Sequence, residues 1–192
     1  IQPISLDEAY LDLSEDVRDE CDDAPAAALG RAALRIEAEV GITVSIGLAY
    51  NKFLAKLASD LDKPRGYSVI GREEALDFLS DLSVKKINGV GAVTAKKMAE
   101  QGIETIGQLQ AMSKDELVCR YGRFGRRLAG FVRGEDRRRV SSGGAAKSVS
   151  AETTFTTDLR DAADLKERVR PMCERVADRL KAKGIAGGTV IL

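Results

Sequence analysis

A pair of neighbouring acids near the start of the chain, Asp7 and Glu8, divides a run of alternating apolar residues and constrains the fold more than any other feature. The apolar positions have even numbers before the acids and odd numbers after them: Ile4, Leu6, Ala9, Leu11 and Leu13. One face of a continuous strand keeps a single parity. The change at the acids therefore predicts two short, half-buried strands joined by a tight turn or bulge, with both carboxylates at its tip.

Two adjacent carboxylates repel each other, and a divalent cation between them relieves that repulsion. Mg²⁺ binds through one or two carboxylates and takes its remaining ligands from phosphates and water. Asp7 and Glu8 are therefore candidate metal ligands. The alternative is a surface hairpin whose acidic tip is simply solvated, and an Asp-Glu pair alone does not exclude it.

Charge is unevenly distributed along the chain, although 30 basic and 30 acidic side chains cancel over its 192 residues. Residues 1–84 carry 8 basic and 17 acidic side chains, whereas residues 85–147 carry 14 basic and 6 acidic ones. Residues 148–192 are nearly neutral, with 8 basic and 7 acidic side chains. A basic middle after an acidic first part is typical of nucleic-acid binding at the basic part.

The rare residue types exclude several chemistries. The chain has no histidine, which excludes Ser-His-Asp and Cys-His catalysis and His-ligated zinc within it. Cys21, Cys119 and Cys173 are too far apart for a Cys-x-x-Cys site and indicate a reducing, cytoplasmic setting. No apolar run approaches the roughly 20 residues that span a bilayer, so we expect no membrane partner. The start at Ile1 and the end inside the apolar run 189–192 indicate a fragment.

Residues 1–70 combine helical and strand patterns. The expected elements are a helix that starts after Asp22, Asp23 and Pro25 and ends at Gly41, a strand over 43–48, a helix over 51–61 and a strand over 67–70. On the helix over 51–61 we expect Phe53 and Leu57 to point inward, and Lys52 and Lys56 to point outward. Strands and helices in this order around one sheet predict an α/β or α+β unit.

Residues 71–134 are expected to be all helical, and residues 87–95 match the helix-hairpin-helix pattern apolar-x-Gly-apolar-Gly-x-x-x-Ala. Gly89 and Gly91 permit a sharp turn, and they let backbone N–H groups at the next helix approach a phosphate. Lysines flank the pattern on both sides: Lys85, Lys86, Lys96 and Lys97. The alternative is a glycine-rich turn inside a helical bundle.

A second helical pair is predicted over 103–112 and 124–132, with Ser113 and Glu116 forming a capping box between them. Its arginines fit either a solvated face or phosphate contacts: Arg123, Arg126, Arg127 and Arg133. Residues 135–146 predict a flexible linker whose Arg137 and Arg138 attract polyanions. A new domain is expected from Lys147, with a strand over 147–155, a helix from about 157 to 183 and another strand from Thr189.

Four stretches resemble, in order and spacing, the Y-family translesion DNA polymerases, most nearly the bacterial DNA polymerase IV (DinB) branch: SLDEAYLDLS (5–14), NKFLAKLASDLDKPRGYSVI (51–70), INGVGAVTAKKMAEQGI (87–103) and KSVSAETTF (147–155). The resemblance covers essentially the whole chain. It implies an α+β fold: a partial palm with a ferredoxin-like antiparallel sheet over 1–70, an all-α helix-hairpin-helix thumb over 71–134, the linker over 135–146, and the first part of an α/β little finger over 147–192.

The resemblance also implies roles for individual residues. Asp7 resembles the family's metal-ligating aspartate, Glu8 the adjacent catalytic glutamate near the primer 3′-OH, and Lys63 the lysine that contacts the triphosphate of the incoming nucleotide. The implied DNA contacts are Gly89, Val90, Gly91, Lys96, Arg137, Arg138, Lys147 and Ser148. Arg65 departs from the family, in which asparagine is frequent at this turn.

Several family features are absent from the chain: the first metal-binding aspartate with its aromatic steric gate, the fingers, and the end of the little finger. The resemblance implies a longer parent that extends a primer with dNTPs by two-Mg²⁺ catalysis, binds primer-template DNA, and contacts a sliding clamp through a C-terminal tail outside this chain. We expect this chain alone to be inactive. The alternatives are a non-catalytic polymerase-like DNA-binding module, which would not need both acids, and a nucleotide cyclase, which would not need the helix-hairpin-helix.

Overall fold

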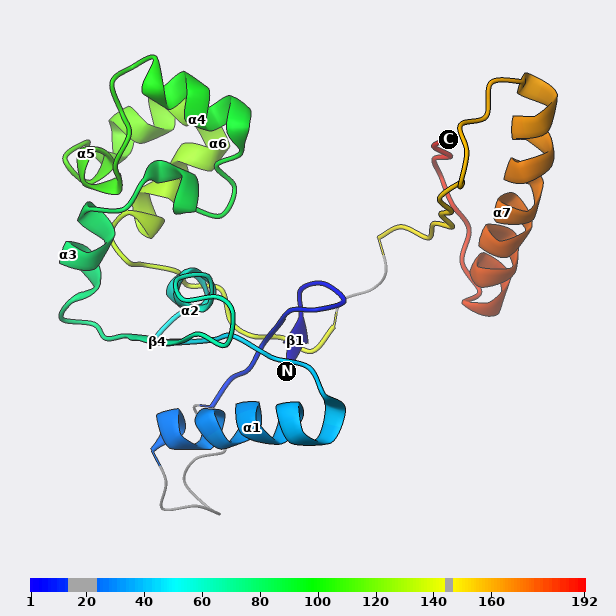
Figure 1. Cartoon of the computed structure of the whole chain (residues 1–192). Coiled ribbons are helices and arrows are strands. Elements are labelled where there is room, and N and C mark those ends of the chain that lie inside the picture. Colours follow the sequence, from blue (N-terminus) through cyan, green and yellow to red (C-terminus); the bar gives the residue numbers. More distant parts are fainter. Residues whose placement is uncertain (14–23, 144–146) are drawn as a thin grey trace. The chain divides into compact units, whose positions relative to one another are not determined.

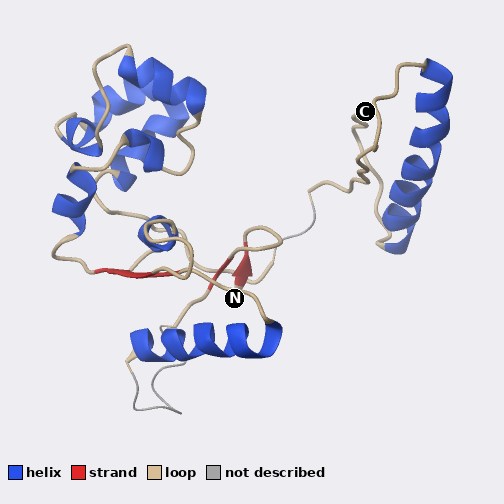
Figure 2. Ribbon diagram, viewed as in Figure 1, coloured by secondary structure: helices blue, strands red, loops and turns tan. Residues whose placement is uncertain are grey.

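The computed structural model describes residues 1–13, 24–143 and 147–192 (Figures 1 and 2). The described chain divides into two units, Ile1–Ser142 and Gly143–Leu192. Helices and short strands both occur, so the predicted mixed fold is confirmed. No helix within the described ranges is long and apolar enough to cross a membrane.

The strands of the first unit form two separate pairs rather than the one sheet that the sequence predicted. β1 (Gln2–Pro3) pairs antiparallel with β2 (Ala9–Tyr10), and β3 (Ile46–Ala49) pairs parallel with β4 (Tyr67–Ile70). β4 has the predicted bounds, whereas β3 begins three residues later than predicted. The hairpin that carries the acids therefore exists, but no ladder joins it to β3 and β4 in the part of the chain that the structure describes.

Two helices accompany these strands. α1 (Pro25–Val40) has Pro25 in its first turn and ends at Gly41 with a left-handed φ of 77°, as predicted. The acids Asp22 and Asp23 lie outside the described residues. α2 (Lys52–Ser59) packs against β3 and β4, and Gly47 permits that close approach because a Cβ there would collide with the α2 backbone.

The remaining helices of the first unit continue the same core. They are α3 (Ala75–Ser80), the 3₁₀ turn η1 (Val84–Lys86), α4 (Ala92–Ala99), α5 (Ile106–Gln110) and α6 (Lys114–Phe131). Ser113 and Glu116 form the predicted capping box of α6, and Gly122 breaks its helical geometry at φ 58° and ψ −134°. One apolar cluster extends from α2 to α6, and the stacked rings of Phe53 and Phe131, 4.4 Å apart, join its two ends.

The second unit is simpler than the sequence predicted. It contains α7 (Ala162–Ala182), which Asp161 caps at its start and which Gly184, with a left-handed φ of 60°, follows two residues after its end. Residues 147–155 and 189–192 form no strand, so both strand predictions are wrong for this structure. A strand needs a hydrogen-bonded neighbour, and no described residue of this unit supplies one.

Candidate catalytic hairpin and nucleic-acid interface

The turn between β1 and β2 holds both predicted acids. The N–H groups of Ile4 and Ser5 donate to the Glu8 carbonyl at 2.8 and 3.3 Å, which closes the turn. The Ser5 hydroxyl donates to Asp7 Oδ1 at 2.6 Å and fixes that carboxylate inside the turn. Asp7 and Glu8 therefore lie at a hairpin tip, as the change of apolar parity predicted.

The flanks of this hairpin are exposed, which corrects the prediction of a half-buried one. Ile4, Leu6 and Leu11 all face solvent. Each strand pairs with one neighbour through two residues only. A ladder this short covers little apolar surface. The alternation of apolar residues thus located the turn correctly but not the burial of its strands.

Asp7 is exposed, and its pKa lies below the ordinary value. The hydrogen bond from Ser5 is the main cause, and the Asp7 backbone N–H and the positive charges of Lys63 and Lys56 act in the same direction. A carboxylate in this setting is ionised at neutral pH and open to a cation.

A chain of ion pairs connects the hairpin to the end of α2. Lys56 Nζ lies 2.7 Å from Glu8 Oε1 and 2.7 Å from Asp60 Oδ2, and Lys63 Nζ lies 2.6 Å from Asp60 Oδ1. Burial would raise the pKa of Asp60, but the hydrogen bonds from Lys56 and Lys63 outweigh it and lower that pKa. Glu8, Lys56, Asp60 and Lys63 form a continuous network, hereafter the hairpin network.

The donor set fits part of a magnesium site. Asp7 offers a carboxylate without a lysine partner at hydrogen-bond distance, whereas Glu8 already pairs with Lys56. The described residues contain no group of three His, Cys, Asp or Glu side chains that could hold a metal. Two carboxylates suffice for Mg²⁺ only when phosphates and water complete the coordination. Mg²⁺ at Asp7 and Glu8 would therefore need further ligands from phosphate and water.

The two glycines of the turn before α4 have different backbone conformations and different surroundings. Gly89 has a φ of 102°, and a Cβ there would lie 3.0 Å from the Phe124 ring. Gly91 is the N-cap of α4, has open space around its Cβ position, and no side chain caps this helix end. Val90 is buried, and its N–H donates to the Ile87 carbonyl at 2.9 Å. The amino end of α4 is thus open to an anion.

Basic side chains surround this turn. The flanking lysines are all exposed: Lys85, Lys86, Lys96 and Lys97. Arg127 reaches from α6 to within 3.9 Å of the Cβ position of Gly89. Arg133, by contrast, donates to the carbonyls of Ala129 and Met112 and stabilises the helix ends. Arg127 on α6 therefore adds to the basic surface, whereas Arg133 after α6 has a structural role.

The predicted linker residues also differ from one another. Arg137 is exposed, whereas Arg138 pairs with Asp136 at 2.7 Å and lies 5.4 Å from the Phe131 ring. The Asp136 side chain is only 3% exposed. Arg138 thus holds residues 136–138 against the end of α6. Lys147 and Ser148 are exposed in the second unit.

Sequence reasoning missed Lys52, which it placed on the outer face of its helix. Lys52 is 8% exposed, and its Nζ donates to Gln2 Oε1 at 2.5 Å and to the Arg139 carbonyl at 3.3 Å. Burial, followed by the charge of Arg138, lowers the pKa of Lys52. Its partners lie 50 and 87 residues away along the chain, so no local pattern could have indicated this burial.

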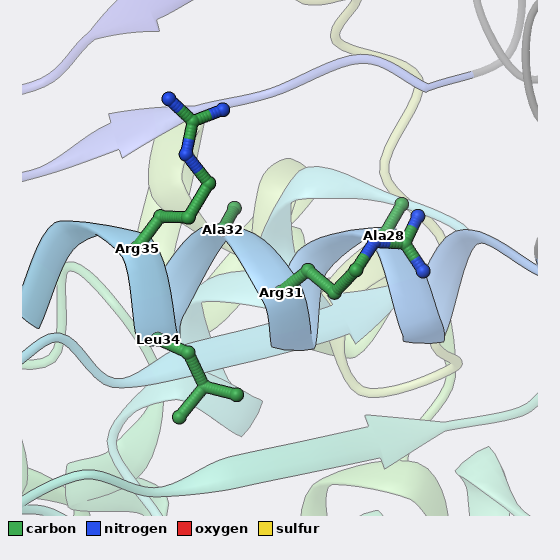
Figure 3. Close-up of a pocket in the computed structure, with 5 residues that line it drawn as sticks. All are labelled: Ala28, Arg31, Ala32, Leu34 and Arg35. Atoms are coloured by element: carbon green, nitrogen blue, oxygen red, sulfur yellow. The ribbon is translucent and has the colours of Figure 1, made fainter. Parts of the chain in front are cut away.

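One surface pocket lies away from these residues. It is on α1 (Figure 3) and is lined by Ala28, Arg31, Ala32, Leu34 and Arg35. Its lining residue Leu34 is exposed to solvent, and none of the predicted site residues lines the pocket. The pocket therefore does not contribute to the candidate site.

Three family models match the chain. The impB/mucB/samB family matches residues 1–60, the thumb domain of DNA polymerase iota matches 85–136, and the impB/mucB/samB family C-terminal domain matches 146–192. The crystal structure of DinB from Sulfolobus solfataricus is similar with a TM-score of 0.56 and 30% identity, over 61% of this chain and 35% of that one.

Curated relatives align along the entire chain. A DNA polymerase IV of Brucella melitensis is 54% identical over 192 residues, which are 100% of this chain and 43% of the relative. DNA polymerase IV 1 of Mesorhizobium japonicum is 51% identical over 192 residues, again 100% of this chain and 44% of the relative. The chain thus spans less than half the length of these two relatives.

Proposed function

The chain belongs to the impB/mucB/samB family of Y-family DNA polymerases, in the DNA polymerase IV branch, and we propose that it is the carboxyl-side part of the core of a translesion DNA polymerase. The longer protein would transfer nucleotides from dNTPs to a primer 3′-OH. The observation that carries this proposal is the hairpin network, because it brings the acidic tip and Lys63 to one side of α2.

In this proposal Asp7 and Glu8 hold Mg²⁺ beside the primer end. Mg²⁺ bound there would stabilise charge on the phosphoryl oxygens and lower the pKa of the primer 3′-OH. Asp7 is the open carboxylate, and Lys56 fixes the orientation of Glu8. Lys63 is half-exposed on Asp60, and a triphosphate would replace Asp60 as its partner. A two-ion site needs further ligands outside this chain, so we expect the chain alone to be inactive.

We assign DNA binding to the turn before α4 and to the basic residues beyond the thumb. Open backbone amides at Gly91 and the exposed ammonium of Lys96 suit phosphate groups, with Gly89 and Val90 shaping the turn. The other proposed contacts are Arg137, Arg138, Lys147 and Ser148. Such contacts fix position on a duplex without reading its bases.

The proposed organisation keeps a palm over 1–70, a thumb over 71–134, a linker over 135–146 and the start of a little finger over 147–192. Family resemblance supports a sliding-clamp contact through a tail outside this chain, and the cysteine pattern supports a cytoplasmic location. A non-catalytic DNA-binding module is the alternative, and it would keep the turn before α4 without depending on Asp7.

The two functions differ in how they respond to the loss of one charge. In the full-length polymerase, Asp7→Asn should lower single-nucleotide incorporation at least about a hundredfold, because a cation ligand is lost. The Kd for primer-template DNA should be nearly unchanged, since Asp7 lies outside the basic surface. Glu39→Gln on α1 is the matched control and should alter neither value.

Incorporation that survives in Asp7→Asn would remove the catalytic role of the hairpin and favour the binding module. Equal losses of incorporation and DNA affinity would show instead that Asp7 supports the fold or DNA contact.

A further inference from the structure

Residues 134–141, which follow α6, lie along the amino end of α2 and are fastened to it. Asn51 Nδ2 donates to the Gly134 carbonyl at 2.7 Å, and Lys52 Nζ donates to the Arg139 carbonyl at 3.3 Å. The Ser141 N–H donates to Gln2 Oε1 at 3.2 Å. The first half of the predicted linker is therefore attached to the amino end of α2. Gln2 of β1 joins the two, because its Oε1 accepts hydrogen bonds from both Lys52 and Ser141.

Lys52 is the residue at which these attachments meet. Besides the Arg139 carbonyl, its ammonium contacts Gln2 Oε1 at 2.5 Å and lies 4.7 Å from the centroid of the Tyr10 ring. A lysine ammonium has three N–H donors. Two of them meet oxygens here, and the charge also lies over an aromatic face. Lys52, which is 8% exposed, thus contacts groups from three segments: β1, β2 and residues 134–141.

Gln2 and Tyr10 are cross-strand partners at the base of the acidic hairpin. Lys56 lies four residues after Lys52 on α2 and pairs with Glu8 at the tip of that hairpin. Residues four apart lie on the same helix face. One face of α2 therefore holds the hairpin at two points, at its base through Lys52 and at its tip through Lys56.

We infer that Lys52 is a positioning residue for the acidic hairpin, which it fixes on α2 and joins to residues 134–141. This inference rests on the proposed function. Lys52 contacts neither Asp7 nor Glu8, so it acts through the hairpin base and not on the reacting atoms. Loss of its ammonium should free the base of the hairpin and residues 134–141 together.

The test compares Lys52→Met with wild type in the full-length polymerase. Amide hydrogen exchange should become at least about tenfold faster in residues 2–10 and 134–141, while the cores of α4 to α6 keep their protection. The Mg²⁺ concentration that half-saturates incorporation should rise at least about tenfold, the lower limit for losing a residue that orients metal ligands. The Kd for primer-template DNA should stay close to wild type.

Two further variants keep the test decisive. Gln2→Ala leaves Lys52 in place and removes the acceptor that Lys52 and Ser141 share, so it should loosen the same two segments. Lys114→Met changes an exposed lysine at the start of α6 and should alter neither exchange nor Mg²⁺ dependence.

Unchanged exchange in both segments, or equally faster exchange throughout the first unit, would overturn the inference. A wild-type protein that fails to extend primers would instead overturn the proposed function, and the exchange result would still report on Lys52.

Discussion

Gly89 and Gly91 lie two positions apart, but they meet different physical demands. Gly89 adopts a left-handed φ of 102° against the Phe124 ring, so an added side chain is strained and collides. Gly91 has an ordinary φ of −80° and open space at its Cβ position. The first glycine therefore serves the fold, whereas the second leaves room for a ligand at the start of α4.

Substitutions at these positions should separate stability from DNA affinity. Gly89→Ala should lower the free energy of unfolding by about 1–3 kcal/mol, the cost of a strained backbone. Gly91→Ser should leave the free energy of unfolding unchanged or slightly higher, because serine is a good N-cap. Its hydroxyl would accept hydrogen bonds from the backbone N–H groups that are proposed to bind phosphate. The DNA affinity of Gly91→Ser should fall about tenfold, because one hydrogen bond to a charged phosphate is lost.

Chemical denaturation and fluorescence anisotropy with DNA duplexes of different sequence would measure both effects. A Gly91→Ser variant that binds all duplexes like wild type would show that phosphates do not approach this turn. A loss confined to one sequence would contradict contact with the backbone alone.

At the scale of elements, residues 134–138 belong to the first unit and not to a free linker, because Asp136 is buried beside Arg138. Burial would raise the pKa of Asp136, but hydrogen bonds from the Arg138 side chain and backbone outweigh it and lower that pKa below 3.8. The folded state then binds a proton less readily than the unfolded state. The contribution of Asp136 to stability is present above pH 3.8 and is lost as the pH falls through its folded pKa.

Asp136→Asn should therefore lower the free energy of unfolding at pH 7 by about 1.5–3 kcal/mol, as expected for hydrogen bonds to a charged group. The difference from wild type should shrink below pH 4, where the native carboxylate also becomes protonated. Denaturation curves between pH 2 and 7 would test this, with Glu39→Gln from an exposed ion pair as the control. A difference that is independent of pH would assign the effect to packing.

Elements with local signals were predicted well. Gly41 ended α1, Ser113 and Glu116 capped α6, and β4 had its predicted bounds, because each depends on residues a few positions apart. The strand over 147–155 was predicted from alternation and the strand from Thr189 from a short apolar run. Both are wrong, since pairing depends on a partner that no local pattern specifies.

In the candidate site, too, the features set by neighbouring residues were predicted, whereas the contacts between distant segments were not. The change of parity at Asp7 located the hairpin tip, and family resemblance selected Lys63. Neither could reveal that Asp60 and Lys56 connect them, or that Lys52 is buried, because these contacts join distant segments. Apolar alternation and family resemblance thus selected the candidate residues, while tertiary packing determined which side chains contact them.

On the scale of the whole molecule, opposite charges occupy different parts of the chain, with an acidic hairpin before a basic thumb. If thumb and linker neutralise about four phosphates, the logarithm of DNA affinity should fall with the logarithm of salt concentration at a slope near −3.6. Lys96→Ala should make that slope shallower by about 0.9, because one phosphate contact is lost. A salt titration by anisotropy measures both values, with Lys114→Met as the control.

A flat salt response in the wild-type protein would show that the basic middle of the chain is only a solvated surface. An unchanged slope in Lys96→Ala would remove that lysine from the interface.

In the proposed mechanism, the tip of the β1–β2 hairpin holds the catalytic cation. Mn²⁺ binding to the full-length polymerase, with primer-template and a non-hydrolysable dNTP, tests it most directly when followed by electron paramagnetic resonance. Asp7→Asn should weaken Mn²⁺ binding at least about tenfold, while Glu39→Gln should bind like wild type. Equal Mn²⁺ affinity in wild type and Asp7→Asn would contradict the claim.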